Sequence, residues 1–301
     1  MKKGPSTPKG FRDVLPELAK KRRETINKIA DVFDSFGFQP LETSTIEFAE
    51  TLQGKYGEEE KLIYKFTDRG GRELALRYDL TVPLARFIAN NLGLLTPTFS
   101  RYQVGQVFRG ENPQKGRYRE FTQMDLDTVG QVSLEEDAKI IAAAIMASRK
   151  IGLSNAKMAV NDRENFSNMK IEVIRAIDKI YKIGKDGAKK EILDRGLTQD
   201  DANIIDEIEN TKPTENLQNI FDLLETKYDL KKDVDFFFDP TLARGLDYYT
   251  GTILELKPNG KPEESSIGGG GRYDNLVGMF AGRQIPAVGF SFGLDRLIEI
   301  I

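Results

Sequence analysis

Two segments of strand character lie on either side of a short polar loop in the middle of the chain. The segments are residues 99–109 and 119–129, and the loop runs from Gly110 to Tyr118. A second alternating pair, 62–67 and 72–78, surrounds the turn Asp68-Arg69-Gly70-Gly71 and is typical of a β-hairpin. Because hairpins recur without a repeating βαβ rhythm, the sequence predicts an α+β fold with an antiparallel sheet flanked by helices.

The remaining elements follow from apolar spacing and end signals. Apolar residues step at helical spacing from Pro16 to Phe36 and a strand is expected over 38–46. A helix is expected over 83–89, and another over 133–151, where Ser133 and Glu136 have capping-box spacing. Further strands are expected at 234–238, 252–256, 266–271 and 287–292, with a final helix from about Leu294.

Between about 165 and 229 the pattern becomes helical only. Gly184 and Gly196 are stop signals, and Thr198 with Asp201 fits a helix cap. We therefore expect an inserted helical module. The chain divides into 1–164, the N-terminal part of a catalytic core, 165–232, the helical insertion, and 233–301, the C-terminal part of the core.

Composition limits the classes of protein that fit. The 301 residues carry 44 Lys and Arg against 47 Asp and Glu, a formal net charge of −3 and a pI near 5.5. This balance argues against strong nucleic-acid binding by these residues alone. The sequence contains neither a long apolar run nor an apolar segment after the first lysines, so we expect no membrane association and a cytoplasmic location.

Three residue types are absent from the sequence. With no Cys and no His, disulfides, thiol nucleophiles and the commonest general base and metal ligand are excluded. Any chemistry must use carboxylates, Arg, Lys, Tyr and bound ions. Trp is also absent, and the joint loss of three residue types supports the hypothesis of deliberate exclusion by engineering.

Four consecutive glycines, Gly268 to Gly271 in SIGGGGRYD, raise the question of a phosphate-binding loop. A Walker loop needs Lys and then Ser or Thr after its last Gly, and a dinucleotide fingerprint needs GxGxxG at the start of a helix. Neither pattern is present. These two phosphate motifs are therefore excluded.

The densest group of reactive side chains is VFRGENPQKGRYREFTQMDLD, residues 107–127. Arg109, Arg117 and Arg119 flank its polar turn. Guanidinium groups bind phosphate oxygens bidentately, so a basic loop between two strands suits a nucleoside triphosphate. A solvated charged hairpin is the alternative. Phe121, Gln123 and Asp127 favour a site, because they share one face of the second strand where a core strand would carry aliphatic residues.

Two further groups lie near the C-terminus. In DPTLARGLDYYTG, residues 239–251, Arg244 precedes Asp247 and a pair of tyrosines; a turn with packed tyrosines fits it as well as a site does. In GFSFGLDR, residues 289–296, a strand runs into a helix whose first turns carry Asp295 and Arg296. An arginine in that position is usually solvated.

Six blocks, taken in order and spacing, carry a specific resemblance. They are KGFRDVLPE, RYDLT, FRGENPQKGRYREFTQMDLD, ARGLDYYTG, GGGGRYDNLV and GFSFGLDRL. Together they resemble the catalytic domain of histidyl-tRNA synthetase, a class II aminoacyl-tRNA synthetase, from Lys9 to Leu297. The resemblance implies a class II antiparallel sheet and adenylate chemistry.

The resemblance implies a set of ATP-binding residues. Arg109 matches the motif 2 arginine that holds the α-phosphate, and Glu111 and Arg117 match residues of the motif 2 loop, of which Arg117 reaches the outer phosphates. Arg296 matches the motif 3 arginine, which packs on adenine opposite the motif 2 aromatic, here Phe121. Arg244 matches a catalytic arginine that lies against the α-phosphate and the substrate histidine, so Arg109 and Arg244 are the expected catalytic residues.

It also implies a histidine pocket. Asp79, Thr81 and Gln123 match the positions that receive the α-ammonium group. Asp127 and Tyr249 match the groups that bind the imidazole, Tyr248 stands beside them, and Tyr273 lines the wall. The glycine run then becomes a strand in the floor of this pocket, where the substrate lies close to backbone.

The implied function is activation of L-histidine by ATP, with Mg²⁺ offsetting phosphate charge through ligands that the sequence does not assign. The substrate carboxylate is already ionised, so this step needs no general base. The resemblance also implies a homodimer. It leads us to expect that the anticodon-binding domain is absent and that transfer to the acceptor end of tRNA(His) is weak. The alternatives are the regulatory subunit of ATP phosphoribosyltransferase, which has no need of Arg109, Arg117, Arg244 and Arg296 together, and an inactive engineered version of the synthetase domain.

Overall fold

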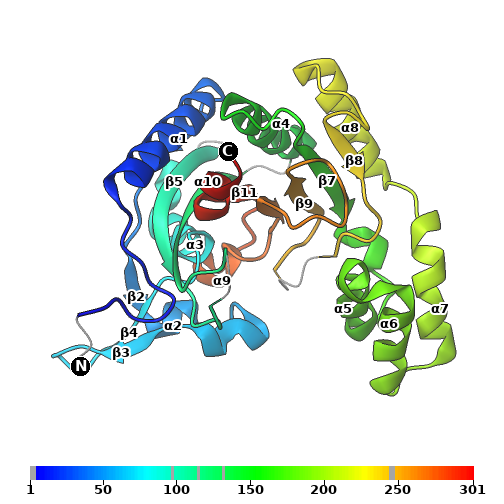
Figure 1. Ribbon diagram of the computed structural model, residues 1–301, viewed down its shortest axis with the longest axis horizontal. Coiled ribbons are helices and arrows are strands. Elements are labelled where there is room, and N and C mark those ends of the chain that lie inside the picture. Colours follow the sequence, from blue (N-terminus) through cyan, green and yellow to red (C-terminus); the bar gives the residue numbers. More distant parts are fainter. Residues whose placement is uncertain (1–4, 96–97, 114–115, 131–132, 244–247) are drawn as a thin grey trace.

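A single eight-stranded sheet forms the centre of the molecule (Figure 1). The computed structural model describes residues 5–95, 98–113, 116–130, 133–243 and 248–301. The sheet consists, in spatial order, of β1 (Gln39–Pro40), β5 (Phe99–Phe108), β6 (Glu120–Val129), β11 (Ala287–Gly293), β10 (Gly268–Arg272), β9 (Thr252–Lys257), β7 (Lys157–Asp162) and β8 (Phe236–Phe238).

The six central strands are antiparallel to one another, as the hairpin pattern predicts. The two outermost strands differ, because β1 runs parallel to β5 and β8 runs parallel to β7. The α+β fold class is confirmed. A separate three-stranded antiparallel sheet has the order β2 (Ile46–Phe48), β4 (Glu73–Leu76), β3 (Lys65–Thr67), and its β3–β4 hairpin is the predicted one.

Helices surround both sheets. The α-helices are α1 (Pro16–Ser35), α2 (Ala49–Leu52), α3 (Thr81–Asn90), α4 (Leu134–Lys150), α5 (Ile171–Ile177), α6 (Ile180–Asp194), α7 (Gln199–Glu207), α8 (Glu215–Tyr228), α9 (Gly278–Ala281) and α10 (Leu294–Ile300). Short 3₁₀ helices span Gly57–Leu62, Leu92–Leu94, Arg163–Phe166 and Ile208–Asn210.

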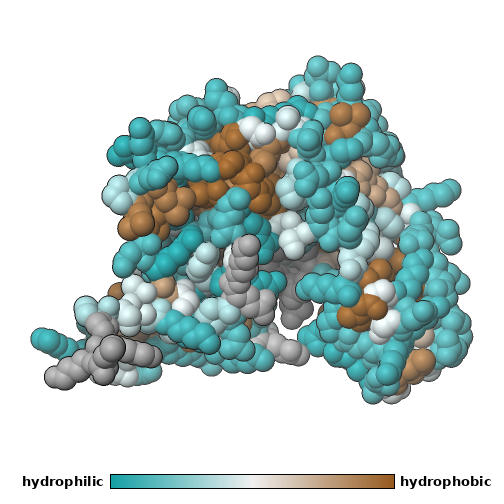
Figure 2. All heavy atoms as spheres, viewed as in Figure 1, coloured by the Kyte–Doolittle hydropathy of each residue, from teal (hydrophilic) through white to brown (hydrophobic). Residues whose placement is uncertain are grey.

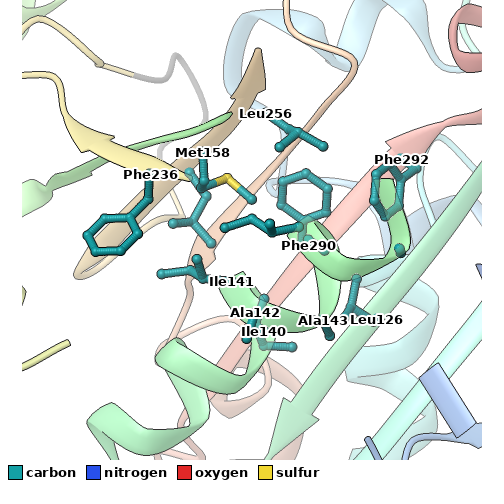
Figure 3. Packing of buried hydrophobic residues seen from close by; sticks show 14 of the residues in the cluster. Leu126, Ile140, Ile141, Ala142, Ala143, Met158, Phe236, Leu256, Phe290 and Phe292 are labelled. Carbon is teal, nitrogen blue, oxygen red and sulfur yellow. The ribbon is translucent and has the colours of Figure 1, made fainter. Parts of the chain in front are cut away.

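One face of the large sheet packs against α4 (Figure 3). Leu126 of β6, Met158 of β7, Leu256 of β9 and Phe290 of β11 belong to one buried cluster with Ile140 to Ala143 of α4. Small alanine side chains in α4 let the helix lie close to the sheet. Since successive residues of a strand point to opposite faces, Gln123, Asp125 and Asp127 of β6 lie on the other face. That second face carries the candidate site.

Val173, Ile177, Ile192 and Ile205 of helices α5 to α7 belong to a second apolar cluster, which also contains Ala159 of β7 and Ile253 of β9. In Figure 1 these helices lie apart from α1 and α4. Helix α8 packs instead on α4, and its Leu217, Ile220, Phe221 and Leu224 belong to the main core. The expected insertion at 165–232 stays a prediction; α5 to α7 share their apolar cluster with the edge of the central sheet, whereas α8 packs into the main core.

Three local expectations differ from the structure. The expected strand 38–46 is two short strands, β1 and β2, which join different sheets. Strand β7 follows directly after α4 and was missed, because its residues give no alternation once both faces are buried. Ser133 does cap α4, but its Oγ accepts from the backbone N–H of Glu135, and the Glu136 carboxylate pairs with Lys139.

The cap between Thr198 and Asp201 forms as a reciprocal capping box at α7. Gly184 adopts a φ of 73° and breaks the helical geometry inside α6. The surface in Figure 2 is mostly hydrophilic, with apolar side chains gathered over α10, where Ile300 is exposed. Among the described residues, none of the helices combines the length and apolar character that a bilayer crossing requires.

Candidate active site

Two adjoining cavities open on the face of the sheet opposite α4. We call the first, of about 360 Å³, the inner lobe and the second, of about 380 Å³, the outer lobe. Both are lined by Glu59, Arg109, Arg117, Gln123, Gly269 and Ser291. Since these residues border both cavities, the two lobes form one continuous cleft.

The described residues of the predicted histidine pocket all line the inner lobe. They come from the start of α3 and the residues just before it, from β6 and from loops beside β10, and they are Asp79, Thr81, Gln123, Asp127, Tyr248, Tyr249 and Tyr273. The described residues of the predicted ATP site all line the outer lobe: Arg109, Glu111, Arg117, Phe121 and Arg296. Segments far apart in the sequence therefore meet in the two groups that the resemblance implies.

Asp79 is held at the start of α3. Its Oδ1 accepts hydrogen bonds from the backbone N–H of Val82 and from the Tyr56 hydroxyl, both at 3.0 Å. Burial raises the pKa of the Asp79 carboxyl, while the hydrogen bonds and Arg109 oppose this rise. The carboxylate is thus fixed in position by the helix end and presented to the inner lobe beside Thr81.

Three acceptor atoms of the inner lobe have no hydrogen-bond partner among the described residues, and the third of them, Asp127 Oδ2, is within ion-pair distance of Arg101. Gln123 donates from Nε2 to Ser291 Oγ at 2.7 Å, and its Oε1 is buried without a hydrogen bond. Asp125 Oδ1 is likewise buried and unpartnered. Burial raises the pKa of the Asp125 carboxyl to about 7, and the nearby carboxylates of Asp127 and Asp79 contribute to this rise. Unpaired buried acceptors are costly, so this part of the cleft suits a ligand that donates hydrogen bonds.

Asp127 follows Gln123 and Asp125 on the same face of β6. Its Oδ1 accepts from the Tyr273 hydroxyl, and its Oδ2 forms an ion pair with Arg101 at 2.7 Å. Burial raises the pKa of the Asp127 carboxyl above its ordinary value, although Arg101 and the Tyr273 hydroxyl oppose this rise. Tyr248 connects this group to the rest of the wall, with its ring 4.8 Å from that of Tyr249 and 6.2 Å from that of Tyr273.

Glycines form the floor of the inner lobe. A Cβ on Gly289 would lie 1.9 Å from Asp127 Oδ1, and one on Gly270 would lie 2.1 Å from the Gly289 carbonyl oxygen. Any larger residue would displace the strand or the carboxylate. The glycine run is strand β10, and its Gly269 and Gly270 border the cavity as the resemblance implies.

Arg109 stands where the two lobes meet. Its Nε donates to the Tyr78 carbonyl at 3.2 Å, and its guanidinium lies 4.3 Å from the centre of the Tyr78 ring and 5.1 Å from that of Phe121. Contacts on two aromatic faces fix the plane of the guanidinium. Arg109 therefore stacks on Phe121, the residue that the resemblance places opposite Arg296.

The other charged residues of the outer lobe are less constrained. Arg296 donates to the Ser266 carbonyl, and burial lowers its pKa. Arg117 is about half exposed and lies 3.8 Å from the Glu111 carboxylate. Arg119 does not line the cleft: it donates to the carbonyls of Glu111 and Lys9 and braces the loop. Arg244 lies outside the described residues.

Sequence reasoning missed several lining residues, among them Glu59, Tyr78, Asp125 and Ser291. The signal for Asp125 was present, because it lies between Gln123 and Asp127 in the same two-residue period. Glu59 and Tyr78 gave no comparable signal. They reach the cleft because their segment is held against the end of β5, where the Phe108 N–H donates to the Arg77 carbonyl and the Gly110 N–H donates to the Leu62 carbonyl.

The outer lobe fits Mg²⁺ only together with a phosphate ligand. No group of three acidic side chains able to hold a metal occurs in the described part of the chain. Magnesium bound with nucleotides usually takes one or two carboxylates, substrate phosphates and water. Glu59 and Glu111 border the outer lobe and match this donor set.

Comparison with known proteins places the chain in a family. The family model for histidyl-tRNA synthetase matches residues 10–297. The histidine--tRNA ligase of Aeropyrum pernix is 45% identical over 98% of this chain and 74% of its own length. That of Korarchaeum cryptofilum is 40% identical, also over 98% and 74%.

Solved structures agree. Histidyl-tRNA synthetase from Nostoc sp. PCC 7120 superposes with a TM-score of 0.85 at 31% identity, covering 99% of this chain and 75% of that one. A structure described as an ATP phosphoribosyltransferase regulatory subunit/histidyl-tRNA synthetase from Bacillus halodurans C has a TM-score of 0.81 at 24% identity, covering 98% and 82%, and shows the shared fold. The chain therefore belongs to the histidyl-tRNA synthetase family and is a class II aminoacyl-tRNA synthetase.

Proposed function

We propose that this protein activates L-histidine with ATP to form histidyl-adenylate and pyrophosphate. A carboxylate oxygen of histidine bonds to the α-phosphorus, and the bond from that phosphorus to the oxygen bridging the β-phosphorus breaks, so that pyrophosphate leaves with the electron pair. The nucleophile is already ionised. Positioning and charge stabilisation therefore supply most of the catalysis.

The single observation that carries the proposal is the continuity of the two lobes. One lobe offers acceptors and tyrosines, the other offers guanidinium groups and an aromatic ring, and Arg109 borders both. A carboxylate held in the inner lobe would face an α-phosphate held by Arg109. Arg109 would then stabilise the negative charge that develops on the non-bridging oxygens.

The inner lobe has groups for each polar part of histidine. Asp79, Thr81 and Gln123 can accept from the α-ammonium, which is the correct polarity for a three-donor cation. Asp127 can accept the imidazole N–H and the Tyr249 hydroxyl can donate to the other ring nitrogen. Amino acids without these atoms would leave buried polar groups unpaired, which lowers their affinity strongly.

In the outer lobe, Phe121 and Arg296 are the proposed faces for adenine, and Arg117 with Glu111 the proposed contacts toward the outer phosphates. Arg244 is proposed as a second catalytic arginine from the resemblance alone. Mg²⁺, when bound, offsets phosphate charge, with Glu59 and Glu111 as its proposed protein ligands.

Amino-acid-dependent exchange of labelled pyrophosphate into ATP tests the proposal. We expect exchange with histidine alone among the twenty amino acids, and a loss of at least ~100-fold in Arg109→Gln, the scale of removing one charge-stabilising group. The matched control is Arg195→Gln, an exposed arginine at the end of α6, which should retain full exchange.

Two other outcomes would redirect the assignment. Histidine binding by calorimetry without exchange would favour the regulatory subunit of ATP phosphoribosyltransferase or an inactive engineered domain. Exchange driven by another amino acid would contradict the assignment of Asp127 and Tyr249.

Transfer to tRNA(His) and assembly are further parts of the proposal. With a net charge of −3, these residues alone should bind the acceptor end of tRNA(His) weakly. Charging at low enzyme concentration would contradict this. A homodimer is proposed from the resemblance of the first block to motif 1, and a cytoplasmic location stays an expectation.

A further inference from the structure

Arg101 is a fully buried arginine beside the inner lobe. Its position on β5 is opposite Asp127 on β6 in the antiparallel register, so both side chains lie on the cleft face of the sheet. Arg101 does not border the cavity itself. It lies behind the acceptor side chains that line the inner lobe.

The contacts of Arg101 connect two parts of the proposed histidine pocket. One terminal nitrogen pairs with Asp127 Oδ2 at 2.7 Å and lies 3.4 Å from the Leu80 carbonyl oxygen, between Asp79 and Thr81. The Nε and the other terminal nitrogen are buried without a partner among the described residues. The guanidinium is therefore only partly satisfied.

A side chain with this environment costs stability. A guanidinium stays protonated in proteins, so burial cannot neutralise it, and a buried ion pair with unsatisfied donors is seldom stabilising compared with an apolar replacement. A packing role alone would be better served by Met or Leu. The contact with Asp127 indicates a role other than packing.

Asp127 faces several charged or titratable groups. Tyr273 follows β10 and donates to it, Asp125 precedes it on β6, and Asp79 lies before α3. On β11 the residue opposite Asp127 is Gly289, which carries no charge. Arg101 from β5 is the cation paired with Asp127 in this group. Arg101 also lowers the pKa of Asp125. Without the charge of Arg101, burial would favour a protonated Asp127.

We propose that Arg101 is a positioning residue that holds Asp127 ionised and oriented, so that the pocket accepts an N–H from the imidazole of histidine. A protonated Asp127 would compete as a donor and could not accept with the same strength. The inference rests on the proposed function, because it assumes that Asp127 binds the substrate ring.

The test is the pH dependence of KM for histidine in pyrophosphate exchange, measured from pH 7 to 8.5. Every protein in this test also carries Asp125→Asn, because Asp125 lines the same lobe with a pKa of about 7 and would itself titrate in this range. We expect a flat KM in this reference protein. Arg101→Met should raise KM at pH 7 by roughly tenfold or more, with a smaller change in kcat, and KM should fall as pH rises because Asp127 must then lose its proton first. Arg101→Lys retains the charge and should keep the flat profile.

Arg86→Met is the matched control. Arg86 is partly buried and also pairs with a buried carboxylate, that of Glu47, and neither residue borders the cleft. The change should lower stability without introducing a pH-dependent KM. An Arg101→Met profile parallel to that of the reference protein at every pH would overturn the inference.

Two further variants test the inference if Arg101→Met does not fold. A sloping KM profile in Arg101→Lys would overturn the proposal, because the charge is still present. In the Asp127→Asn background, Arg101→Lys should have no further effect on KM, whereas additive effects would show that the two residues act independently. If the unaltered protein shows no histidine-dependent exchange, the proposed function itself fails and is distinguished from a failure of this inference.

Discussion

Arg22 in the first helix and Asp295 in the last form an ion pair at 2.5 Å, although 273 residues separate them. The same carboxylate accepts from Arg12 and, at 2.7 Å, from the backbone N–H of Thr122 in β6. One side chain thus joins the segments that resemble motifs 1, 2 and 3. Arg296 of the outer lobe is the next residue, so this junction fixes the start of the helix that carries it.

Asp295→Asn should weaken both folding and ATP binding. The change leaves two partly buried guanidinium groups without their shared anion, which should cost on the order of 2–4 kcal/mol. The exposed Asp186→Asn is the control. Thermal unfolding and KM for ATP measure the result. An unchanged KM for ATP would show that Asp295 stabilises the fold without positioning Arg296.

Asp125→Asn should change the pH dependence of stability. Burial raises the pKa of Asp125 from 3.8 to about 7. Below about pH 4 the Asp125 carboxyl is protonated in both the folded and the unfolded protein, and between pH 4 and 7 it is protonated only in the folded protein. Unfolding in this range therefore releases a proton, and the free energy of unfolding falls as pH rises.

Asparagine cannot ionise, so the Asp125→Asn variant does not lose stability in this way as pH rises. Its stability relative to the unaltered protein should rise from pH 4 to 7 by at most ~4 kcal/mol and then stay constant. Denaturant unfolding of the ligand-free protein at pH 4.5, 6 and 8 measures it. A difference that is the same at all three pH values would show that Asp125 keeps an ordinary pKa.

Gly289→Ala should damage the inner lobe selectively. The added methyl would lie 1.9 Å from Asp127 Oδ1, so the carboxylate must move. We expect KM for histidine to rise at least tenfold, with a stability loss of about 1–3 kcal/mol. Gly93→Ala is the control, since its Cβ would meet no atom within 4 Å. Equal effects of both changes on KM would contradict the prediction.

Phe48→Lys should prevent the proposed homodimerisation. Ile46 and Phe48 on β2 and Phe66 on β3 are exposed, and the register places Phe48 and Phe66 on either side of Leu74. This gives the small sheet an apolar outer face, a usual sign of a protein interface. Light scattering after gel filtration should show a dimer in the unaltered protein and a monomer in the variant. A monomeric unaltered protein would contradict the proposal.

The sequence predicted most of the sheet because its elements carry local signals. The hairpin 99–129 has strands long enough to alternate, and the polar loop marks their connection. β7 gave no signal, since a strand buried on both faces does not alternate. The division of 38–46 into two strands depends on pairing with two different sheets, which local propensity does not encode.

The sequence by itself determined the fold class, the family resemblance and the faces of β6, because alternation and motif order are properties of the chain. Only the tertiary structure decided which residues meet. Arg101 is opposite Asp127 through the strand register, Glu59 reaches the cleft from the 3₁₀ helix Gly57–Leu62, and Asp295 joins both ends of the chain. The physical reason is that charge pairing and burial act through space, and the cost of an unpaired buried group appears only when its surroundings are assembled.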